Sequence, residues 1–220
     1  MKKLILSLVF GIAVITSCKN DDPVPTTATF SFNVGFTGNS SSFLNFSTGE
    51  IVLTEIVWDG TLEGSTLPTS VTHSVVTTIA VATGVANPAI PVIEISPGKY
   101  SKISMGIELW DNGVDANIIL EGIFTHSDAS TFPIKFIFDS GEVFETTLAS
   151  LTIAPGSNTL CTLNLNPILW FANITQSELE EAALSSGTIV LSESSNAALY
   201  DKVEEAILNA TTDDTSISCN

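Results

Sequence analysis

The sequence predicts a mainly β protein, an antiparallel β-sandwich with two short C-terminal helices packed at one end. Apolar and polar residues alternate over several short stretches, which is the period of a strand with one buried face. Turns rich in glycine and proline separate these stretches, which favours short strands joined by hairpins. The alternation stops near Pro167, and apolar residues then recur at helical spacing.

Strands are expected through most of the chain between residues 29 and 167. Clean alternation predicts half-buried strands in four stretches: 30–36, 103–109, 132–138 and 161–165. Four further stretches carry apolar residues at both odd and even positions, which indicates bulged strands or strands covered on both faces. They are 51–58, 71–82, 117–124 and 143–153. Turn sequences between them include Asp59-Gly60, Ser96-Pro97-Gly98 and Pro155-Gly156.

Two helices are expected from about residue 168. Thr175 and Glu178 have the spacing of a capping box, which predicts the start of the first helix. Ser195 is the expected cap of the second, in which Leu199, Val203 and Ile207 recur every four residues. A short strand is expected between the helices, at 189–191. The sandwich domain is therefore expected to span 29–210, and 211–220 to form a frayed polar tail.

The first eighteen residues have the zones of a secretory signal. Lys2 and Lys3 precede an uncharged apolar run over 4–15, which is too short to span a bilayer. The run ends in Ile15-Thr16-Ser17-Cys18, which resembles the lipobox of bacterial lipoproteins. The resemblance implies a signal peptide at 1–17 and a diacylglycerol on the thiol of Cys18. This lipid would anchor the chain to its membrane partner. The alternative is an ordinary signal peptide in which Cys18 is incidental.

The residues after Cys18 suggest where the chain is delivered. Lys19-Asn20-Asp21-Asp22 resembles the lysine-plus-acidic export signal of Bacteroidota lipoproteins, carried here by Lys19, Asp21 and Asp22. The resemblance implies an outer membrane lipoprotein displayed at the cell surface; the alternative is the leaflet that faces the periplasm. Residues 18–28 are then a tether, in which Pro23 and Pro25 disfavour a helix or a central strand.

A second resemblance concerns the fold. Ile95-Ser96-Pro97-Gly98-Lys99-Tyr100, followed by an alternating strand, is similar to a turn in uncharacterised Bacteroidota lipoproteins. The C-terminal order of Trp170-Phe171, a helix, Gly187-Thr188-Ile189 and then Asn196 to Tyr200 is also similar to them. These families have transthyretin-like or immunoglobulin-like sandwiches, so the resemblance implies a fold and carries over no site residues.

The charge of the chain excludes one class of partner. The formal net charge is -17, and without Lys2 and Lys3 the mature chain has 5 lysines against 24 acidic residues, or -19. The sequence contains no arginine, the residue best suited to grip phosphate. Nucleic-acid binding needs a basic surface, so a nucleic-acid partner is excluded. An acidic surface mainly keeps the chain soluble.

The sequence contains no recognisable catalytic or metal motif. His73 and His126 lack metal-ligand spacing, and we interpret both as surface or strand-edge histidines. The oxygen-rich stretch from Asp111 to Asp115 supplies too few ligands for calcium and is interpreted as a hairpin turn. No cofactor, metal or enzymatic activity is therefore expected. A glycan-acting hydrolase would need only two carboxylates close together in a concave site, which a sequence cannot reveal.

Three residues remain as candidates for particular roles. The alternation over 103–109 places Trp110 on the outward face of its strand. Exposed aromatic side chains stack on sugars or anchor protein interfaces. The alternative is a Trp110 covered by a loop or helix. Cys161 and Cys219 can form a disulfide after export; alternatively, Cys161 packs as a small apolar side chain in register with Leu163 and Leu165.

These observations lead to three hypotheses of function. The first is a lipid-anchored binding or accessory module of the cell envelope, without catalytic activity, whose glycan or protein partner is undetermined. The second is a structural or adhesive subunit of a fimbria-like assembly, for which 27–36 is the strand that could be exchanged. The third is the hydrolase.

Overall fold

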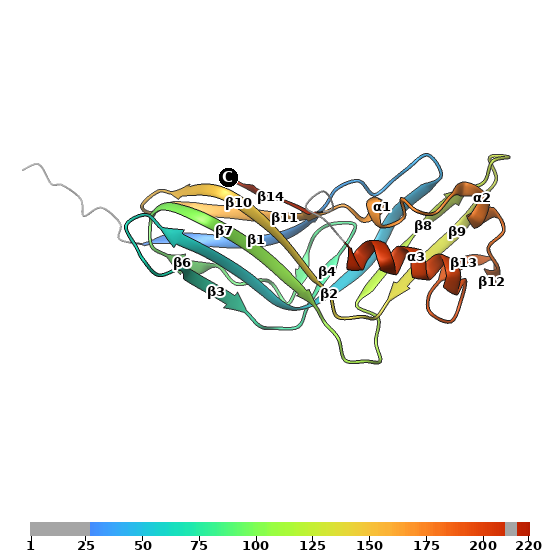
Figure 1. Cartoon of the computed structure of the whole chain (residues 1–220), viewed down its shortest axis with the longest axis horizontal. Helices are drawn as coiled ribbons and strands as arrows, with labels where there is room; N and C mark the ends of the chain where they lie inside the picture. The colour runs from blue at the N-terminus through green and yellow to red at the C-terminus, as the bar shows by residue number, and fades with distance from the viewer. Residues whose placement is uncertain (1–26, 210–214) are drawn as a thin grey trace, which may run out of the picture.

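The computed structural model describes residues 27–209 and 215–220, which form a mainly β molecule with three short helices (Figure 1). The predicted signal peptide at 1–17, the lipidation residue Cys18 and the export residues Lys19, Asp21 and Asp22 lie outside the described residues. Among the helices of the described part, none is long and apolar enough to cross a bilayer.

The strands form two sheets. The small sheet has four strands in the spatial order β14 (Thr215–Cys219), β11 (Asn158–Leu165), β1 (Ala28–Phe36) and β6 (Ile93–Ile95). The main path of the large sheet runs β10 (Val143–Ile153), β7 (Gly98–Leu109), β2 (Leu44–Leu62), β8 (Ile118–Thr125), β9 (Thr131–Phe138), β13 (Thr188–Leu191) and β12 (Leu184–Ser185). Off this path, β3 (Thr69–His73) and β4 (Thr77–Ala80) pair with β2, and β5 (Ala86–Asn87) pairs with β4.

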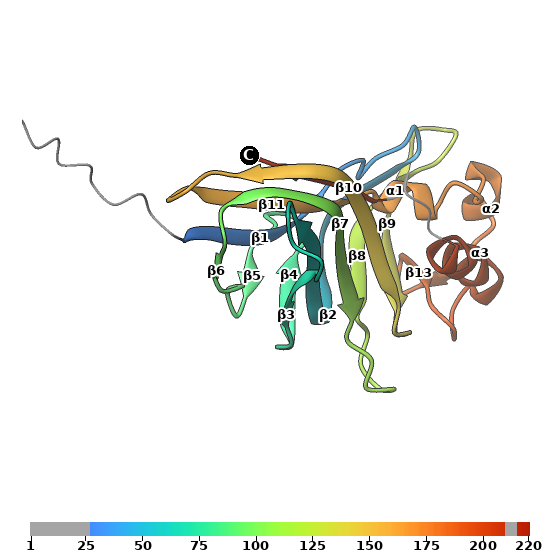
Figure 2. The ribbon, with the colours of Figure 1, turned by 60° about the vertical axis from the view of Figure 1, so that its left-hand side comes forward.

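The 19-residue strand β2 joins two halves of the molecule (Figure 1). Its first part pairs with β8, and its second part pairs with β7 on one edge and β3 on the other. Figure 2 shows β7 and β10 curving from the layer of β1 and β11 toward the layer of β2. The second part of β2 therefore lies opposite the small sheet, and the two layers pack face to face as a sandwich.

The helices α1 (Pro167–Trp170), α2 (Gln176–Glu180) and α3 (Ala197–Leu208) lie at the β8–β9–β13 end of the molecule (Figure 1). Two helices were predicted at one end, and among the described residues the single turn α1 is an additional one. The capping box that opens α2 is confirmed. The Thr175 hydroxyl accepts a hydrogen bond from the Glu178 N–H at 3.3 Å, and the Glu178 carboxylate accepts one from the Thr175 N–H at 2.9 Å. Both groups therefore satisfy backbone donors that the first turn leaves free.

The prediction that Ser195 caps α3 is wrong by one residue. The cap is Asn196, in the left-handed conformation with φ 51° and no side-chain hydrogen bond to the helix. Its amide instead bonds the N–H and C=O of Ala183 and the C=O of Val190. Asn tolerates this conformation, and its amide carries both donors and acceptors for such a bridge.

Two other predictions need correction. The sandwich is not wholly antiparallel, because β1 pairs with β11, and β13 with β9, in parallel. The C-terminal tail at 211–220 is not frayed throughout, because its residues Thr215–Cys219 form β14 in antiparallel register with β11. Residues 211–214 of that tail lie outside the described part of the chain. Alternation identifies a strand but does not encode its partner or direction.

Candidate ligand-binding pocket

An apolar hollow lies at the open edge of the sandwich, between the edge strands β3 and β6. Its first wall comes from β2 and β3, where Trp58 pairs with Val71 and Ile56 with His73. Paired residues of antiparallel strands share a face, and so do residues two positions apart. These four side chains therefore form one patch, directed at the small sheet.

The opposite wall comes from β1 and β6. Phe30 pairs with Ile93, and Phe32 follows on the same face. Ile90 and Pro91, which precede β6, close the side of the hollow. The cavity volume is about 30 Å³, within an empty space of about 300 Å³ that includes the open mouth.

Aromatic side chains hold Trp58 in place at the base of this hollow. The indole packs against Phe30 and Tyr100, with ring centroids 5.3 and 5.2 Å away. A β-carbon at Gly60 would come within 2.8 Å of the Trp58 ring, so only glycine leaves room for it there. The Tyr100 hydroxyl donates to the Ser96 carbonyl at 2.7 Å, and burial raises the pKa of Tyr100. Tyr100 thus ties the turn before β7 to the wall that carries Trp58.

Two residues that line the hollow carry a buried ring nitrogen with no hydrogen-bond partner among the described residues. These nitrogens are Nε1 of Trp58, whose side chain is 2% exposed, and Nε2 of His73. A buried polar group without a partner costs about 1–3 kcal/mol, so such groups call for an explanation. The two residues are diagonal neighbours across β2 and β3. The backbone positions of such neighbours are roughly 7–8 Å apart, so long side chains at these positions can contact each other. Both nitrogens are buried and both residues line the hollow, so a ligand would contact them only after a small displacement of the lining side chains.

Other buried side-chain atoms also lack a partner in the described part of the chain. They belong to Asn39, Asn117 and Trp170, and none of these residues lines the hollow. The edge hollow is distinguished because it combines two such atoms with an apolar lining and an opening to solvent.

Trp110, the ligand contact proposed from sequence parity, lies elsewhere. It follows β7 directly, is half-buried, and its backbone N–H donates to the Val52 carbonyl at 2.9 Å. It does not line the edge hollow. His73 is a strand-edge histidine as expected, on β3. No signal in the sequence singled out Trp58, because its stretch, 51–58, carries apolar residues at both odd and even positions and nothing local linked Trp58 to His73.

His126 lies beside polar groups that could suggest catalysis. Its Nδ1 is 3.2 Å from an Asp128 oxygen, 3.6 Å from a Glu180 oxygen and 3.5 Å from the Ser127 hydroxyl. A serine–histidine–carboxylate relay needs the serine on one ring nitrogen and the carboxylate on the other. Here both groups contact Nδ1, so the arrangement does not activate Ser127.

The carboxylates around His126 are held in the ionised form. Hydrogen bonds from Ser130 lower the pKa of Asp128, and the hydrogen bond from the Ser127 N–H lowers the pKa of Glu180. Ionised carboxylates accept hydrogen bonds but donate none. Neither group is therefore arranged as a general acid at neutral pH.

A second hollow, on the outer face of β2, β7 and β10, is acidic. Its lining includes four carboxylates: Glu55, Asp59, Glu108 and Glu145. Such a cluster was the structural requirement of the hydrolase hypothesis. Glu108 and Glu145 are exposed to solvent, and Glu55 and Asp59 are half-buried, whereas general acid catalysis uses full burial to keep a carboxyl group protonated. The hollow therefore offers surface charge rather than an arranged acid–base pair.

The stretch from Asp111 to Asp115 forms a self-contained turn. Asp111 accepts from the Gly113 N–H at 2.8 Å, and Asn112 accepts from the N–H groups of Val114 and Asp115 at 3.0 and 2.9 Å. Within residues 27–209 and 215–220, no group of three or more His, Cys, Asp or Glu residues could hold a metal ion. The side-chain oxygens of Asp111 and Asn112 are thus used by the turn itself.

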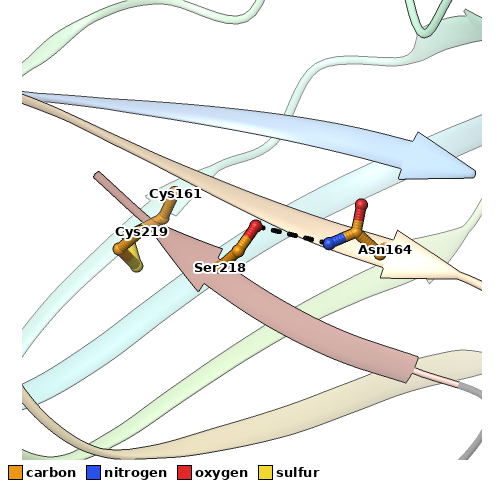
Figure 3. The surroundings of a disulfide bond; sticks show 4 residues. All are labelled: Cys161, Asn164, Ser218 and Cys219. Atoms are coloured by element: carbon orange, nitrogen blue, oxygen red, sulfur yellow. Dashed lines mark hydrogen bonds between the residues drawn. A yellow bond between two sulfur atoms is a disulfide. The ribbon is translucent and has the colours of Figure 1, made fainter.

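Cys161 and Cys219 form a disulfide, and Cys161 also packs in the core beside Leu163 and Leu165, so both roles considered for Cys161 apply. The two residues are directly paired across β11 and β14, with Cα atoms 4.1 Å apart (Figure 3). Three positions along β11, the Asn164 amide donates to the Ser218 hydroxyl at 3.4 Å. The bond fastens the C-terminal strand to the strand next to β1.

The fold and the hollow define a class of protein rather than a family: a two-sheet β-sandwich with capping helices and an apolar edge pocket. No family model, curated protein or solved structure matches the chain. Function is therefore inferred from the residues of this chain.

Proposed function

We propose that this chain is a lipid-anchored, non-catalytic binding module of the cell envelope, and that its ligand enters the edge hollow. The observation that carries the proposal is the pair of unpartnered nitrogens, on Trp58 and His73, in an apolar pocket that opens to solvent. Pockets of this kind, apolar with a few convergent polar groups, are typical of ligand sites. The anchor is inferred from the lipobox at Ile15–Cys18.

Lipidation of Cys18 is tested in native membranes. We expect Cys18→Ser to release the chain from the membrane fraction, because two or three acyl chains supply the attachment at about 0.8 kcal/mol per buried methylene. Asn20→Ser, which creates the same residue two positions away, should leave the chain membrane-bound. Mass spectrometry of the mature chain that finds the Cys18 thiol unmodified would contradict the anchor.

Surface display is tested by protease access in intact cells. If Lys19, Asp21 and Asp22 direct export, the chain should be shaved from whole cells, and Asp21→Ala with Asp22→Ala should protect it. Protection of the unaltered chain would favour the periplasm-facing leaflet instead.

Binding in the hollow is tested with the chain from residue 19, which contains every described residue. We expect a library of small neutral and charged fragments to include compounds that raise its melting temperature, since a ligand that binds only the folded state stabilises it. Val71→Phe, which fills the hollow, should abolish these shifts. Val114→Phe makes the same change at a distant side chain that is 80% exposed, and should preserve them. Shifts that survive Val71→Phe would place binding outside the hollow.

The fimbria-like alternative makes a different prediction about β1. This strand lies between β11 and β6 and buries Ala28, Phe30 and Val34. Its exchange between copies would open the centre of the small sheet and form concentration-dependent oligomers. Light scattering that shows a strict monomer at high concentration would count against this alternative.

A further inference from the structure

We infer that the edge hollow is specific for a neutral, apolar molecule that bears a hydroxyl or carbonyl oxygen. This inference rests on the proposed function, since it names the chemistry of the ligand that the hollow would bind.

The unpartnered nitrogens define the polar part of the ligand. The indole N–H of Trp58 can only donate, so it needs an acceptor oxygen. The imidazole Nε2 of His73 donates or accepts according to its tautomer. A hydroxyl group satisfies both nitrogens at once, because it can accept from Trp58 while it donates to His73. A carbonyl oxygen satisfies Trp58 with one lone pair and a donating His73 with the other.

Charge excludes the ionic alternatives. The lining residues are Phe30, Phe32, Ile56, Trp58, Val71, His73, Ile90, Pro91 and Ile93, and they include no lysine, aspartate or glutamate. An anion would meet no fixed counter-charge there and would approach a mature chain of net charge -19. A cation would lose its hydration without gaining a carboxylate. A neutral ligand avoids both costs.

The dimensions define the apolar part. A cavity of about 30 Å³ corresponds to two or three water-sized groups, at roughly 10–15 Å³ each. It therefore accommodates the functional end of a molecule, while a short branched chain extends into the mouth. The half-buried side chains of Ile90 and Ile93 offer apolar surface to that chain.

Three probes with one carbon skeleton separate these possibilities: 3-methyl-1-butanol, isovalerate and 3-methylbutylamine. They are titrated into the ¹⁵N-labelled chain from residue 19, and the indole N–H resonances of its three tryptophans are followed. Trp58→Phe assigns the resonance of Trp58 by its loss. We expect the alcohol to shift this resonance, and to bind at least tenfold more tightly than the anion or the amine.

Matched variants test the role of each nitrogen. Trp58→Phe keeps an aromatic ring but removes the N–H, and should weaken binding of the alcohol by about 5- to 150-fold, the range of a hydrogen bond lost to a buried group. Trp110→Phe makes the same change outside the hollow and should leave binding unaltered. If Trp58→Phe does not fold, His73→Leu on the edge strand β3 carries the test, with a smaller but measurable loss expected.

The outcomes distinguish this inference from the proposed function. Equal or tighter binding of isovalerate or the amine would overturn the inference. It would also be overturned if the alcohol left the Trp58 resonance unmoved while charged fragments raised the melting temperature in a way that Val71→Phe abolishes. The proposed function would survive both results. If no fragment of any class gives a shift that Val71→Phe abolishes, the proposed function fails with the inference.

Discussion

Loss of the Cys161–Cys219 disulfide should destabilise the domain substantially. The bond joins residues 58 positions apart, so it removes the freedom of a long loop from the unfolded chain. For a loop of that length, the chain-entropy relation gives about 4 kcal/mol at 25 °C. A domain of this size loses about 2–4 °C in melting temperature per kcal/mol, so we expect a decrease of roughly 8–16 °C.

The assay is thermal unfolding of the chain from residue 19, followed by circular dichroism with and without reductant, and repeated with Cys219→Ser. Amide hydrogen exchange should accelerate in β14, because non-covalent contacts alone, chiefly a ladder of five residue pairs, would then hold that strand to β11. Ser218→Ala is the matched control. It removes only the exposed 3.4 Å hydrogen bond to Asn164 and should change the melting temperature by about 1 °C or less.

A decrease below 2 °C on reduction, with β14 still protected from exchange, would refute this reasoning. It would mean that the ladder to β11 and the packing of Thr215, which is 3% exposed, suffice to retain the strand.

Three further changes test the helical end of the molecule. Thr175→Ala should lower the unfolding free energy by about 1 kcal/mol, measured by urea denaturation, because it removes the cap of α2; an unchanged midpoint would contradict this. Hydrogen bonds from Lys202 and Thr175 lower the pKa of Glu178 to about 2, so its contribution should be present above pH 4.5 and decline as the pH falls toward 2. Glu178→Gln should therefore flatten the acid unfolding curve in that interval, and an unaltered curve would exclude this role. Burial raises the pKa of Glu204, and so does the neighbouring Asp201, which means that the charge of Glu204 opposes folding at neutral pH. Glu204→Gln should therefore raise the melting temperature at pH 7, but not in acid below the raised pKa, where Glu204 is already neutral. An unchanged or lower melting temperature of Glu204→Gln at pH 7 would refute this effect of the Glu204 charge.

Features that depend on neighbouring residues were predicted correctly. Alternation over 103–109 identified a strand with one buried face, and Ile103, Met105, Ile107 and Leu109 are all buried. The spacing of Thr175 and Glu178 identified a capping box, because both partners of a cap lie within one turn. The error at Ser195 arose where a distant residue, Ala183, recruited the side chain of Asn196.

The candidate site could not be predicted in this way. Trp58 and His73 are each unremarkable in their own strands, and they form one patch only because β2 and β3 pair in the observed register. The facing wall, with Phe30 on β1, comes from a part of the chain that precedes both strands. Trp110 was proposed instead because parity describes a face of a strand but not what covers it.

The class of fold, the positions of most strands and the start of α2 could be predicted from the sequence alone, because each depends on local periodicity or capping. Four further features became visible only in the folded molecule: the parallel pairing of β1 with β11, the strand β14, the disulfide and the edge hollow. These features depend on contacts between remote residues, such as the hydrogen bond from the Thr29 hydroxyl to the carbonyl of Ser157, 128 positions away. Local patterns restrict which elements form, whereas the pairing of distant strands follows from how the whole core is buried.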